Sequence, residues 1–253
     1  MKISVLLPYK ENFSPDYPGA VSLFVNDTLK YSNFKNNVTV YGSTNYKNTF
    51  NHKYQNLVVN NKIFKSQNRV YVDEFLKIEN KTGSDLIEIH NRPIYIKYLE
   101  NKLKKNNFIL YFHNDPLSMN GSKSVNERLN LIKKCHRIIF NSIWSKKRFI
   151  QDLNSEDVVY ENLLVINQSA RKININFNKK KKIITFVGKL NKSKGYDLFG
   201  NAIIKILNKH KDWKSIVIGD EPRDKINFEH KNLSVIGFVK HNTVLDYYKS
   251  ASI

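Results

Sequence analysis

The sequence predicts an α/β protein with doubly wound parallel sheets, arranged as two units joined by a polar linker. Short β-branched runs alternate with amphipathic helical patterns along most of the 253 residues, which favours parallel strands with helices on both faces. Residues 167–182 lack apolar periodicity and close in four consecutive lysines, as is typical of an interdomain linker. A second strand and helix alternation then occupies residues 183–253.

Apolar runs predict the strands of the first unit, residues 1–166, and helical spacing predicts the helices between them. The predicted strands are Ile3–Leu7, Val38–Tyr41, Leu57–Val59, Asp85–Ile89, Phe108–Phe112, Arg137–Phe140 and Leu163–Ile166. The predicted helices are Val21–Tyr31, Val70–Glu79, Ile94–Lys105, Ser124–Cys135 and Trp144–Leu153. Asn141 and Ser142 can cap the last of these helices.

The second unit, residues 183–253, repeats the pattern on a smaller scale. Its predicted strands are Ile183–Val187, Ser215–Ile218 and Leu233–Ile236, and its predicted helices are Tyr196–Lys209 and Thr243–Ser250. About 70 residues is small for a doubly wound domain, so we expect this unit to be incomplete.

The charge is strongly positive, with 42 Lys and Arg against 22 Asp and Glu, a formal net charge of +20. The basic residues are nearly all lysine, whereas nucleic-acid readers tend to recruit arginine. A solvated lysine-rich surface is therefore the first interpretation, contact with anionic lipid headgroups the second, and nucleic acid the third. The single cysteine, Cys135, excludes an intrachain disulfide and a multi-cysteine metal site.

The amino-terminal apolar run ends at Pro8, too soon for a signal peptide. No run approaches the ~20 apolar residues that a membrane-spanning helix needs. We therefore expect a cytoplasmic protein, either free or peripheral on the inner face of the cytoplasmic membrane.

A strand followed by a glycine and two lysines five residues apart is the strongest local motif, over Phe186–Gly195. Glycine admits close backbone approach of a ligand, and a helix start offers free N–H groups to an anion. Lys189 and Lys194 could then neutralise a diphosphate. The alternative is a lysine-rich surface loop, and the segment is not a Walker loop because the Gly-Lys-Ser/Thr ending is missing.

Two histidines, His90 and His113, fall at the carboxyl ends of predicted parallel strands, where α/β sheets bind ligands. Each could equally be a hydrogen-bonded structural histidine. Asp115 could bind a substrate or fix the turn before Pro116. Trp144 and Trp213 are expected to be packing residues.

Taken in order, these motifs resemble the family 4 (group 1) glycosyltransferases, which are built on the two-domain GT-B scaffold. The matching segments are Pro18–Ala20, Glu88–Asn91, Tyr111–Asp115, Phe140–Ser142, Val165–Asn167, Val187–Gly195, Ile216–Pro222, Val235–Val239 and Asp246–Ala251. The resemblance implies two Rossmann-like domains and a retaining hexosyltransferase. It would move a sugar from a nucleotide-diphosphate donor to a glycan or lipid-linked acceptor, in surface polysaccharide or lipopolysaccharide biosynthesis.

The resemblance also implies roles for particular residues. Gly188, Lys189, Lys194 and Gly195 would bind the donor diphosphate, and Gly219, Gly237, Phe238 and Val239 would lie near the base. Gly19 and Ala20 would form the donor and acceptor loop, His113 would be catalytic beside the donor sugar, and His90 and Asp115 would line the cleft. Lys189 replaces the family's arginine, and Ala20 replaces its second glycine.

No cofactor or metal is expected, because no Asp-any-Asp triplet of the metal-dependent GT-A enzymes occurs. The family continues after the Ala251 region with a strand, a Pro-Ser turn and two donor-binding glutamates separated by seven residues. This sequence ends at Ile253, so we expect a C-terminally truncated member. Two alternatives stay open: an inactive fragment that lacks the glutamate pair, and a non-catalytic basic module that binds a membrane surface or nucleic acid.

Overall fold

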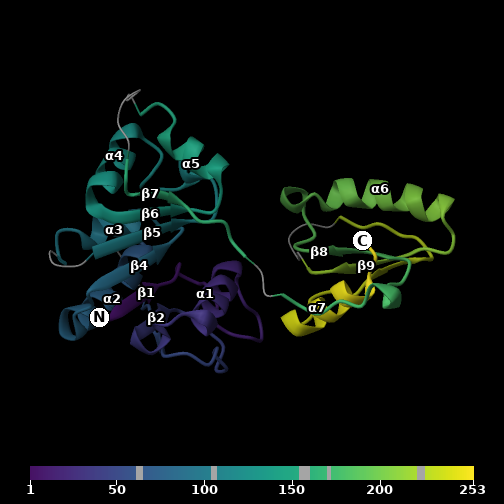
Figure 1. Ribbon diagram of the computed structural model, residues 1–253, viewed down its shortest axis with the longest axis horizontal. Coiled ribbons are helices and arrows are strands. Elements are labelled where there is room, and N and C mark those ends of the chain that lie inside the picture. Colours follow the sequence, from purple (N-terminus) through teal and green to yellow (C-terminus); the bar gives the residue numbers. More distant parts are fainter. Residues whose placement is uncertain (61–64, 104–106, 154–159, 170–171, 221–225) are drawn as a thin grey trace. The chain divides into compact units, whose positions relative to one another are not determined.

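The computed structural model describes residues 1–60, 65–103, 107–153, 160–169, 172–220 and 226–253 (Figure 1). The chain divides into two compact units, Met1–Arg171 and Lys172–Ile253. The predicted linker, 167–182, spans this division, and its later residues belong to the second unit.

The described part of the first unit contains a seven-stranded, entirely parallel sheet in the order β3-β2-β1-β4-β5-β6-β7. Its strands are β1 (Ile3–Leu6), β2 (Val38–Gly42), β3 (Tyr54–Asn56), β4 (Leu86–His90), β5 (Asn107–Phe112), β6 (Cys135–Phe140) and β7 (Leu163–Val165). The strand order reverses between β1 and β4, and the loops that leave these two strands diverge there. In doubly wound sheets this reversal opens a crevice at the carboxyl ends of the strands.

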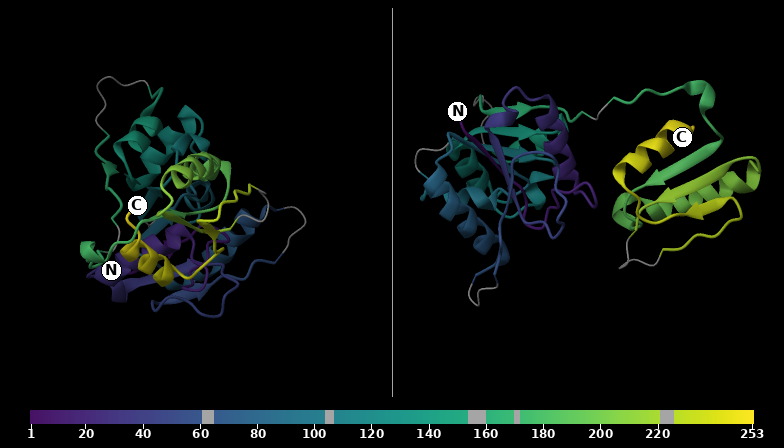
Figure 2. Two further views of the ribbon diagram at one scale, coloured as in Figure 1. Left: turned by 90° about the vertical axis from the view of Figure 1, so that its right-hand side faces the viewer. Right: turned by 90° about the horizontal axis from the view of Figure 1, so that it is seen from below.

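Helices cover both faces of this sheet (Figures 1 and 2). They are α1 (Ala20–Tyr31), α2 (Gln67–Thr82), α3 (Ile94–Leu99), α4 (Val125–Lys134) and α5 (Ile143–Ile150). The predicted cap at Ser142 is confirmed, because its hydroxyl accepts the backbone N–H of Ser145 at 3.1 Å. Ser124 and Glu127 form a complete capping box at the start of α4.

Strand β1 is covered on both sides because its side chains alternate between the two faces. Ile3 and Val5 pack in one core cluster with the apolar side of α1. Leu6 belongs to the other cluster, beneath α2 to α5. On that second side the Ser4 hydroxyl also donates to the buried Glu79 carboxylate of α2 at 2.9 Å. Both faces of β1 are thus buried, as expected for a central strand of a doubly wound sheet.

The second unit contains a smaller parallel sheet in the order β10-β9-β8 within its described residues. Its elements are β8 (Ile183–Val187), α6 (Tyr196–Lys209), β9 (Lys214–Ile218), β10 (Leu233–Val235) and α7 (His241–Ser250). Ile184, Ile203 and Leu207 form its buried core between β8 and α6. The segment after α7 runs beside β8, with the Thr185 N–H donating to the Ile253 carbonyl at 2.8 Å.

Three sequence predictions of local structure are wrong. The third strand is Tyr54–Asn56 rather than Leu57–Val59, because Tyr54 pairs with β2 and stacks on Phe13 with ring centroids 5.3 Å apart. Helix α5 ends at Ile150 rather than Leu153, since Asp152 adopts a left-handed φ of 60°.

The predicted helix Ile94–Lys105 ends at Leu99. The Leu99 carbonyl accepts the N–H groups of both Lys102 and Leu103, and this double acceptance closes the helix. Lys104 and Lys105 lie outside the described residues, and so do Glu221 and Pro222 of the segment that resembles the family.

Candidate functional site

His90 and His113 lie next to the reversal of strand order in the first sheet. His90 is the last residue of β4, and its neighbour across the β4–β5 pair is Tyr111. His113 follows β5 directly, two residues beyond Tyr111. Because alternate residues of a strand share a face, the two imidazoles come to the same side of the sheet.

A continuous row of hydrogen bonds joins these histidines to a carboxylate. The His90 Nδ1 and His113 Nε2 atoms are 2.8 Å apart. On its other side, His90 Nε2 lies 2.7 Å from Glu88 Oε1. The Gln168 side-chain amide contacts Nδ1 of His113. The His90 side chain is fully buried, and the Glu88 side chain is 20% exposed.

Two asparagines fix the backbone of His113 from the neighbouring strands. Asn91, which has a left-handed φ of 50°, accepts the His113 N–H on its side-chain oxygen at 2.8 Å. The Asn141 side chain donates to the His113 carbonyl at 2.9 Å. Asparagine tolerates this backbone region better than most residues, so the position after β4 suits it. His113 is therefore held at both its amide and its carbonyl.

Aromatic rings enclose the histidine pair. The Phe24 ring meets His113 edge-on with centroids 5.0 Å apart, and the Tyr111 ring stacks on His90 at 4.8 Å. This burial, and then the positive charge that His90 would add, lower the pKa of His113 from 6.5 to about 3. A buried imidazole loses more by charging than an exposed one, so His113 is neutral at physiological pH.

The loop residues Gly19 and Ala20 lie at the start of α1, where a carboxylate of the chain itself already sits. Glu11 Oε1 accepts the Ser22 N–H at 3.0 Å. A Cβ on Gly19 would lie 1.9 Å from that oxygen, so glycine is what admits the carboxylate. Ala20, the first residue of α1, is exposed. Contact of these two residues with a donor stays a prediction.

Asp115 caps the turn after β5. Its Oδ1 accepts the Leu117 N–H at 3.0 Å, and its Oδ2 lies 3.3 Å from Arg148 Nη2. These contacts match the turn-fixing interpretation of this residue, and a substrate contact stays a prediction. Trp144, by contrast, is 57% exposed and lies beside the Arg148 guanidinium, so its expected packing role is wrong.

In the second unit, the Gly188–Gly195 loop joins β8 to α6. The Gly188 N–H donates to the Ile218 carbonyl of β9 at 3.0 Å, which anchors the start of the loop. The Asn191 side chain accepts the Lys194 N–H at 3.1 Å. Gly195 takes a left-handed φ of 74° and α6 starts at the next residue. The sequence correctly predicted this strand, loop and helix.

Three glycines that follow the three strands of this sheet meet at one edge. A Cβ on Gly219 would lie 1.8 Å from the Gly188 carbonyl oxygen, and φ at Gly219 is 139°. The Gly219 N–H in turn donates to the Gly237 carbonyl at 2.9 Å. No side chain can therefore stand at Gly219, and the edge presents backbone N–H and C=O groups at close quarters.

The remaining predicted residues of this unit lie around that edge. Lys189 and Lys194 are exposed, and neither forms an ion pair within the described part of the chain. Phe238 is 42% exposed and Val239 is partly buried, directly after Gly237. The structure thus brings the predicted diphosphate and base residues of this unit together at the carboxyl edge of one sheet.

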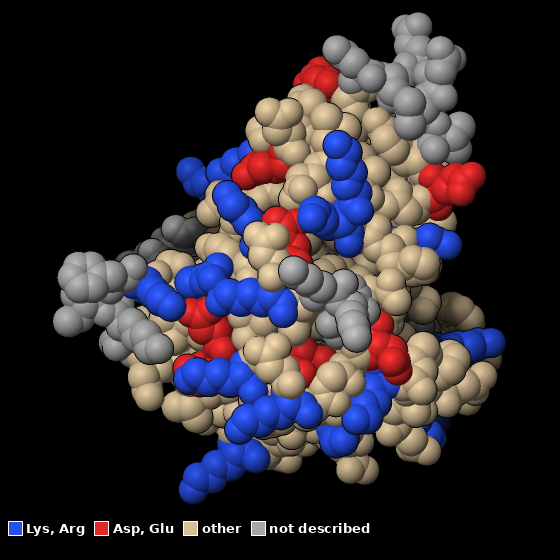
Figure 3. Space-filling view, turned by 90° about the vertical axis from the view of Figure 1, so that its left-hand side faces the viewer, with Lys and Arg blue, Asp and Glu red and all other residues tan. Residues whose placement is uncertain are grey.

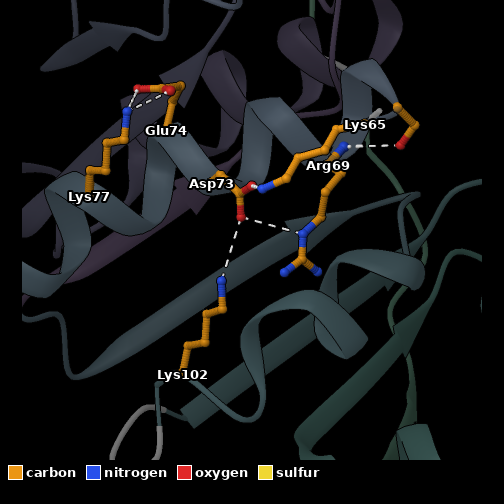
Figure 4. A network of polar contacts seen from close by, with 7 residues as sticks. Lys65, Arg69, Asp73, Glu74, Lys77 and Lys102 are labelled. Carbon is orange, nitrogen blue, oxygen red and sulfur yellow. Dashed lines mark hydrogen bonds and ion pairs between the residues drawn. The ribbon is translucent and has the colours of Figure 1, made fainter. Parts of the chain in front are cut away.

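The basic residues of the first unit do not form a single-sign patch on the face seen in Figure 3, where carboxylates lie between the lysines and arginines. Figure 4 shows one such group on α2 and on the segments just before α2 and after α3. Asp73 Oδ2 lies 2.8 Å from Lys65, and Asp73 Oδ1 lies 3.4 Å from Arg69 and 3.6 Å from Lys102. Burial alone would raise the pKa of Asp73, but these cations outweigh it and lower the pKa.

Within the described residues no group of three His, Cys, Asp or Glu side chains is arranged to hold a metal ion. None of the described helices combines the length and apolar character needed to cross a bilayer.

Sequence reasoning missed four contributors to the histidine site: Glu88, Asn91, Asn141 and Gln168. One signal for Glu88 was available, since a carboxylate inside an otherwise apolar strand needs a buried partner. The asparagines directly after strands were a weaker signal, because asparagine is also common in ordinary turns. Gln168 lies in the predicted linker, and nothing local marks it.

A family model described as glycosyl transferases group 1 matches residues 167–253. No curated protein matches the chain in sequence. Among solved structures, HepE of Anabaena in complex with UDP-glucose aligns with 12% identity and a TM-score of 0.63, covering 94% of this chain and 70% of HepE.

Two further structures align over nearly the whole chain. MnaA of S. aureus with UDP has 11% identity and a TM-score of 0.60, with coverage of 99% of this chain and 73% of MnaA. The α,α-trehalose 6-phosphate synthase of Burkholderia multivorans has 11% identity and a TM-score of 0.61, with coverage of 99% and 75%. The chain therefore has an α/β fold of the GT-B type, as the sequence predicted.

Proposed function

We propose that this protein is a glycosyltransferase that transfers a sugar from a nucleotide-diphosphate donor. The observation that carries the proposal is the Gly188–Gly195 loop. It combines a strand-end glycine, two exposed lysines and the start of a long helix at one sheet edge. The match of residues 167–253 to the glycosyl transferases group 1 model supports the same assignment.

The loop suits a diphosphate for physical reasons. The start of α6 carries the positive end of the helix dipole, which favours anions. The Tyr196 N–H is bonded to the Asn191 carbonyl, and Asp197 brings one carboxylate to the first turn. Lys189 and Lys194 add two positive charges that are not engaged by carboxylates in the described residues. Stabilising the departing nucleoside diphosphate in this way would lower the barrier electrostatically. Lysine in place of the family's arginine keeps the charge but gives up the two-pronged contact.

The finer features of the proposal rest on the resemblance stated above. They are a retaining hexosyl transfer, a glycan or lipid-linked acceptor, and a place in surface polysaccharide or lipopolysaccharide assembly. His113 would contact a sugar hydroxyl, and Gly219, Gly237, Phe238 and Val239 would lie near the nucleobase. HepE and MnaA have both been solved with UDP, which makes UDP the first donor nucleotide to test.

Nucleotide binding tests the proposal directly. Calorimetric titrations with UDP, GDP and ADP should reveal binding of at least one of them to the unchanged chain. In a Lys189→Ala, Lys194→Ala variant the affinity for that nucleotide should fall by about tenfold or more, because hydrogen bonds to charged groups each contribute roughly 1.5–3 kcal/mol.

A matched control removes the same charge from α6, the helix that follows the loop. Lys205 and Lys209 are exposed on α6, well after its start. Their double replacement by alanine should change nucleotide affinity by less than about twofold, since their charges are screened beyond ~8 Å at physiological salt. Equal losses of nucleotide affinity in the two double variants would mean that net charge alone explains the effect. No binding of any of the three nucleotides would contradict the proposal.

We also propose peripheral association with an anionic membrane as part of this function, because a lipid-linked acceptor would be reached there. The net charge of +20 favours anionic headgroups. Co-sedimentation with vesicles that contain or lack phosphatidylglycerol measures the association. Equal recovery with both kinds of vesicle would remove this part of the proposal.

A further inference from the structure

The polar residues of the first unit's site form a single row across three segments of chain. Glu88 and His90 stand two residues apart on β4 and therefore on the same face. The β4–β5 register sets His90 opposite Tyr111, so that His113 comes next along that face. The row is Glu88, His90, His113 and Gln168, with hydrogen-bond contacts between successive members.

The chemistry of the row gives its hydrogen bonds one direction. An ionised carboxylate only accepts, so Nε2 of His90 donates to Glu88. When the His90 ring carries only this one proton, its Nδ1 has the lone pair and accepts the Nε2–H of His113. That leaves the lone pair of His113 on Nδ1, where the Gln168 amide N–H meets it. In this arrangement every donor in the row has an acceptor, and each imidazole carries a single ring proton.

The surroundings favour this neutral arrangement for His113. Phe24 covers the ring edge-on, and Tyr111 lies parallel to it with centroids 6.1 Å apart. Asn91 and Asn141 bind the His113 backbone and leave the ring to the row. Glu88 is the carboxylate of the row, and it reaches His113 only through His90. Its effect on His113 is therefore exerted through the tautomer of the intervening ring.

We propose that Glu88 is a positioning residue that, through His90, fixes His113 as the Nε2–H tautomer. Nδ1 of His113 is thereby presented as a hydrogen-bond acceptor for a hydroxyl of the sugar substrate. The Gln168 amide donates to the same atom, so a substrate hydroxyl would replace one donor by another. The identity of this ligand rests on the proposed function, whereas the tautomer does not.

The tautomer can be read directly by nitrogen NMR. In the full chain labelled with ¹⁵N-histidine, long-range ¹H–¹⁵N correlations distinguish a protonated from an unprotonated ring nitrogen. A His113→Gln variant identifies the His113 signals among the seven histidines. At pH 7 both His90 and His113 should show protonated Nε2 and unprotonated Nδ1. A protonated Nδ1 on His113 in the unchanged chain would overturn the proposal without any variant.

Two variants of Glu88 separate the relay from a merely structural role. Glu88→Met keeps the size of the side chain and removes the acceptor, so His113 should become a mixture of tautomers. The preference of His113 for the Nε2–H tautomer should fall by about tenfold, because the free energy of a hydrogen bond to a charged group typically exceeds that of a tenfold change in equilibrium. Glu88→Gln keeps an acceptor oxygen and should restore the Nε2–H form. An unchanged tautomer in Glu88→Met would refute the relay.

Nucleotide titration of the same samples distinguishes the two proposals. If the unchanged chain binds no nucleotide, the proposed function fails while the tautomer result still stands. If the chain binds a nucleotide but His113 keeps its tautomer in Glu88→Met, the relay fails alone. Near-UV circular dichroism verifies that each variant is folded before its spectrum is interpreted.

Discussion

Acidification should destabilise the first unit through His113. In the folded chain, burial and then the charge of His90 lower the pKa of this imidazole from 6.5 to about 3. In the unfolded chain the ring keeps its ordinary value and binds a proton below about pH 6.5. Between pH 6.5 and 3 the unfolded state therefore binds more protons than the folded state. By linkage, the free energy of unfolding must fall as the pH falls through that window.

The size of the effect follows from the two pKa values. At pH 5 protonation of this ring favours the unfolded state by a factor of roughly 30, which corresponds to about 2 kcal/mol. At pH 7 the same contribution is only about 0.2 kcal/mol. Between pH 7 and pH 5 the free energy of unfolding should thus fall by nearly 2 kcal/mol because of His113 alone. Above pH 7 the term vanishes, because both states leave the ring neutral.

Urea unfolding of the unchanged chain and of a His113→Gln variant at pH 7 and pH 5 measures this term. The chain has two tryptophans, Trp144 in the first unit and Trp213 in the second. A Trp213→Phe background therefore lets Trp144 fluorescence report the first unit. The background with His113 should lose about 2 kcal/mol more than the variant between the two pH values. Parallel losses within ~0.5 kcal/mol, or a larger loss in the variant, would refute the reasoning.

Four further substitutions test local structure in the two units. Gly219→Ala should destabilise the second unit by more than about 2 kcal/mol, because its Cβ would overlap a backbone carbonyl. Gly237→Ala is the control, since φ is 72° but the space around the position is open, and it should cost only about 1 kcal/mol. Trp213 fluorescence in urea measures both. Ser124→Ala should remove the capping box of α4 at a cost of about 1 kcal/mol, measured by Trp144 fluorescence. Tyr71→Phe should cost ~1 kcal/mol by the same assay, since its buried hydroxyl donates to the Leu7 carbonyl at 2.9 Å.

Local signals allowed much of the fold to be predicted from the sequence. The bounds of β8 and α6, Ile183–Val187 and Tyr196–Lys209, are those expected, because an apolar run, two glycines and a regular helical period mark them. Strand β3 could not be predicted in the same way. Tyr54 belongs to the sheet because it stacks on Phe13, a residue 41 positions earlier in the chain, and no local pattern contains that contact.

The candidate site, too, could be predicted only in part from local sequence signals. His90 and His113 were found because strand ends are where α/β proteins bind ligands. Their mutual hydrogen bond depends on the register between β4 and β5, which a sequence of alternating residues does not specify. The roles of the Gly188 loop and of its lysines come from the resemblance and await the nucleotide titrations.

The Glu11 carboxylate makes the start of α1 a poor place for a second anion. A helix start that already holds a negative charge repels a phosphate group that approaches it. Helix α6 also has a carboxylate in its first turn, Asp197, but two exposed lysines, Lys189 and Lys194, lie in the loop before it. Under the proposed function, we therefore expect the lysine loop of the second unit to contribute more to diphosphate binding than the start of α1 does. A substitution in the loop after β1 should then weaken nucleotide binding less than a substitution of Lys189 or Lys194.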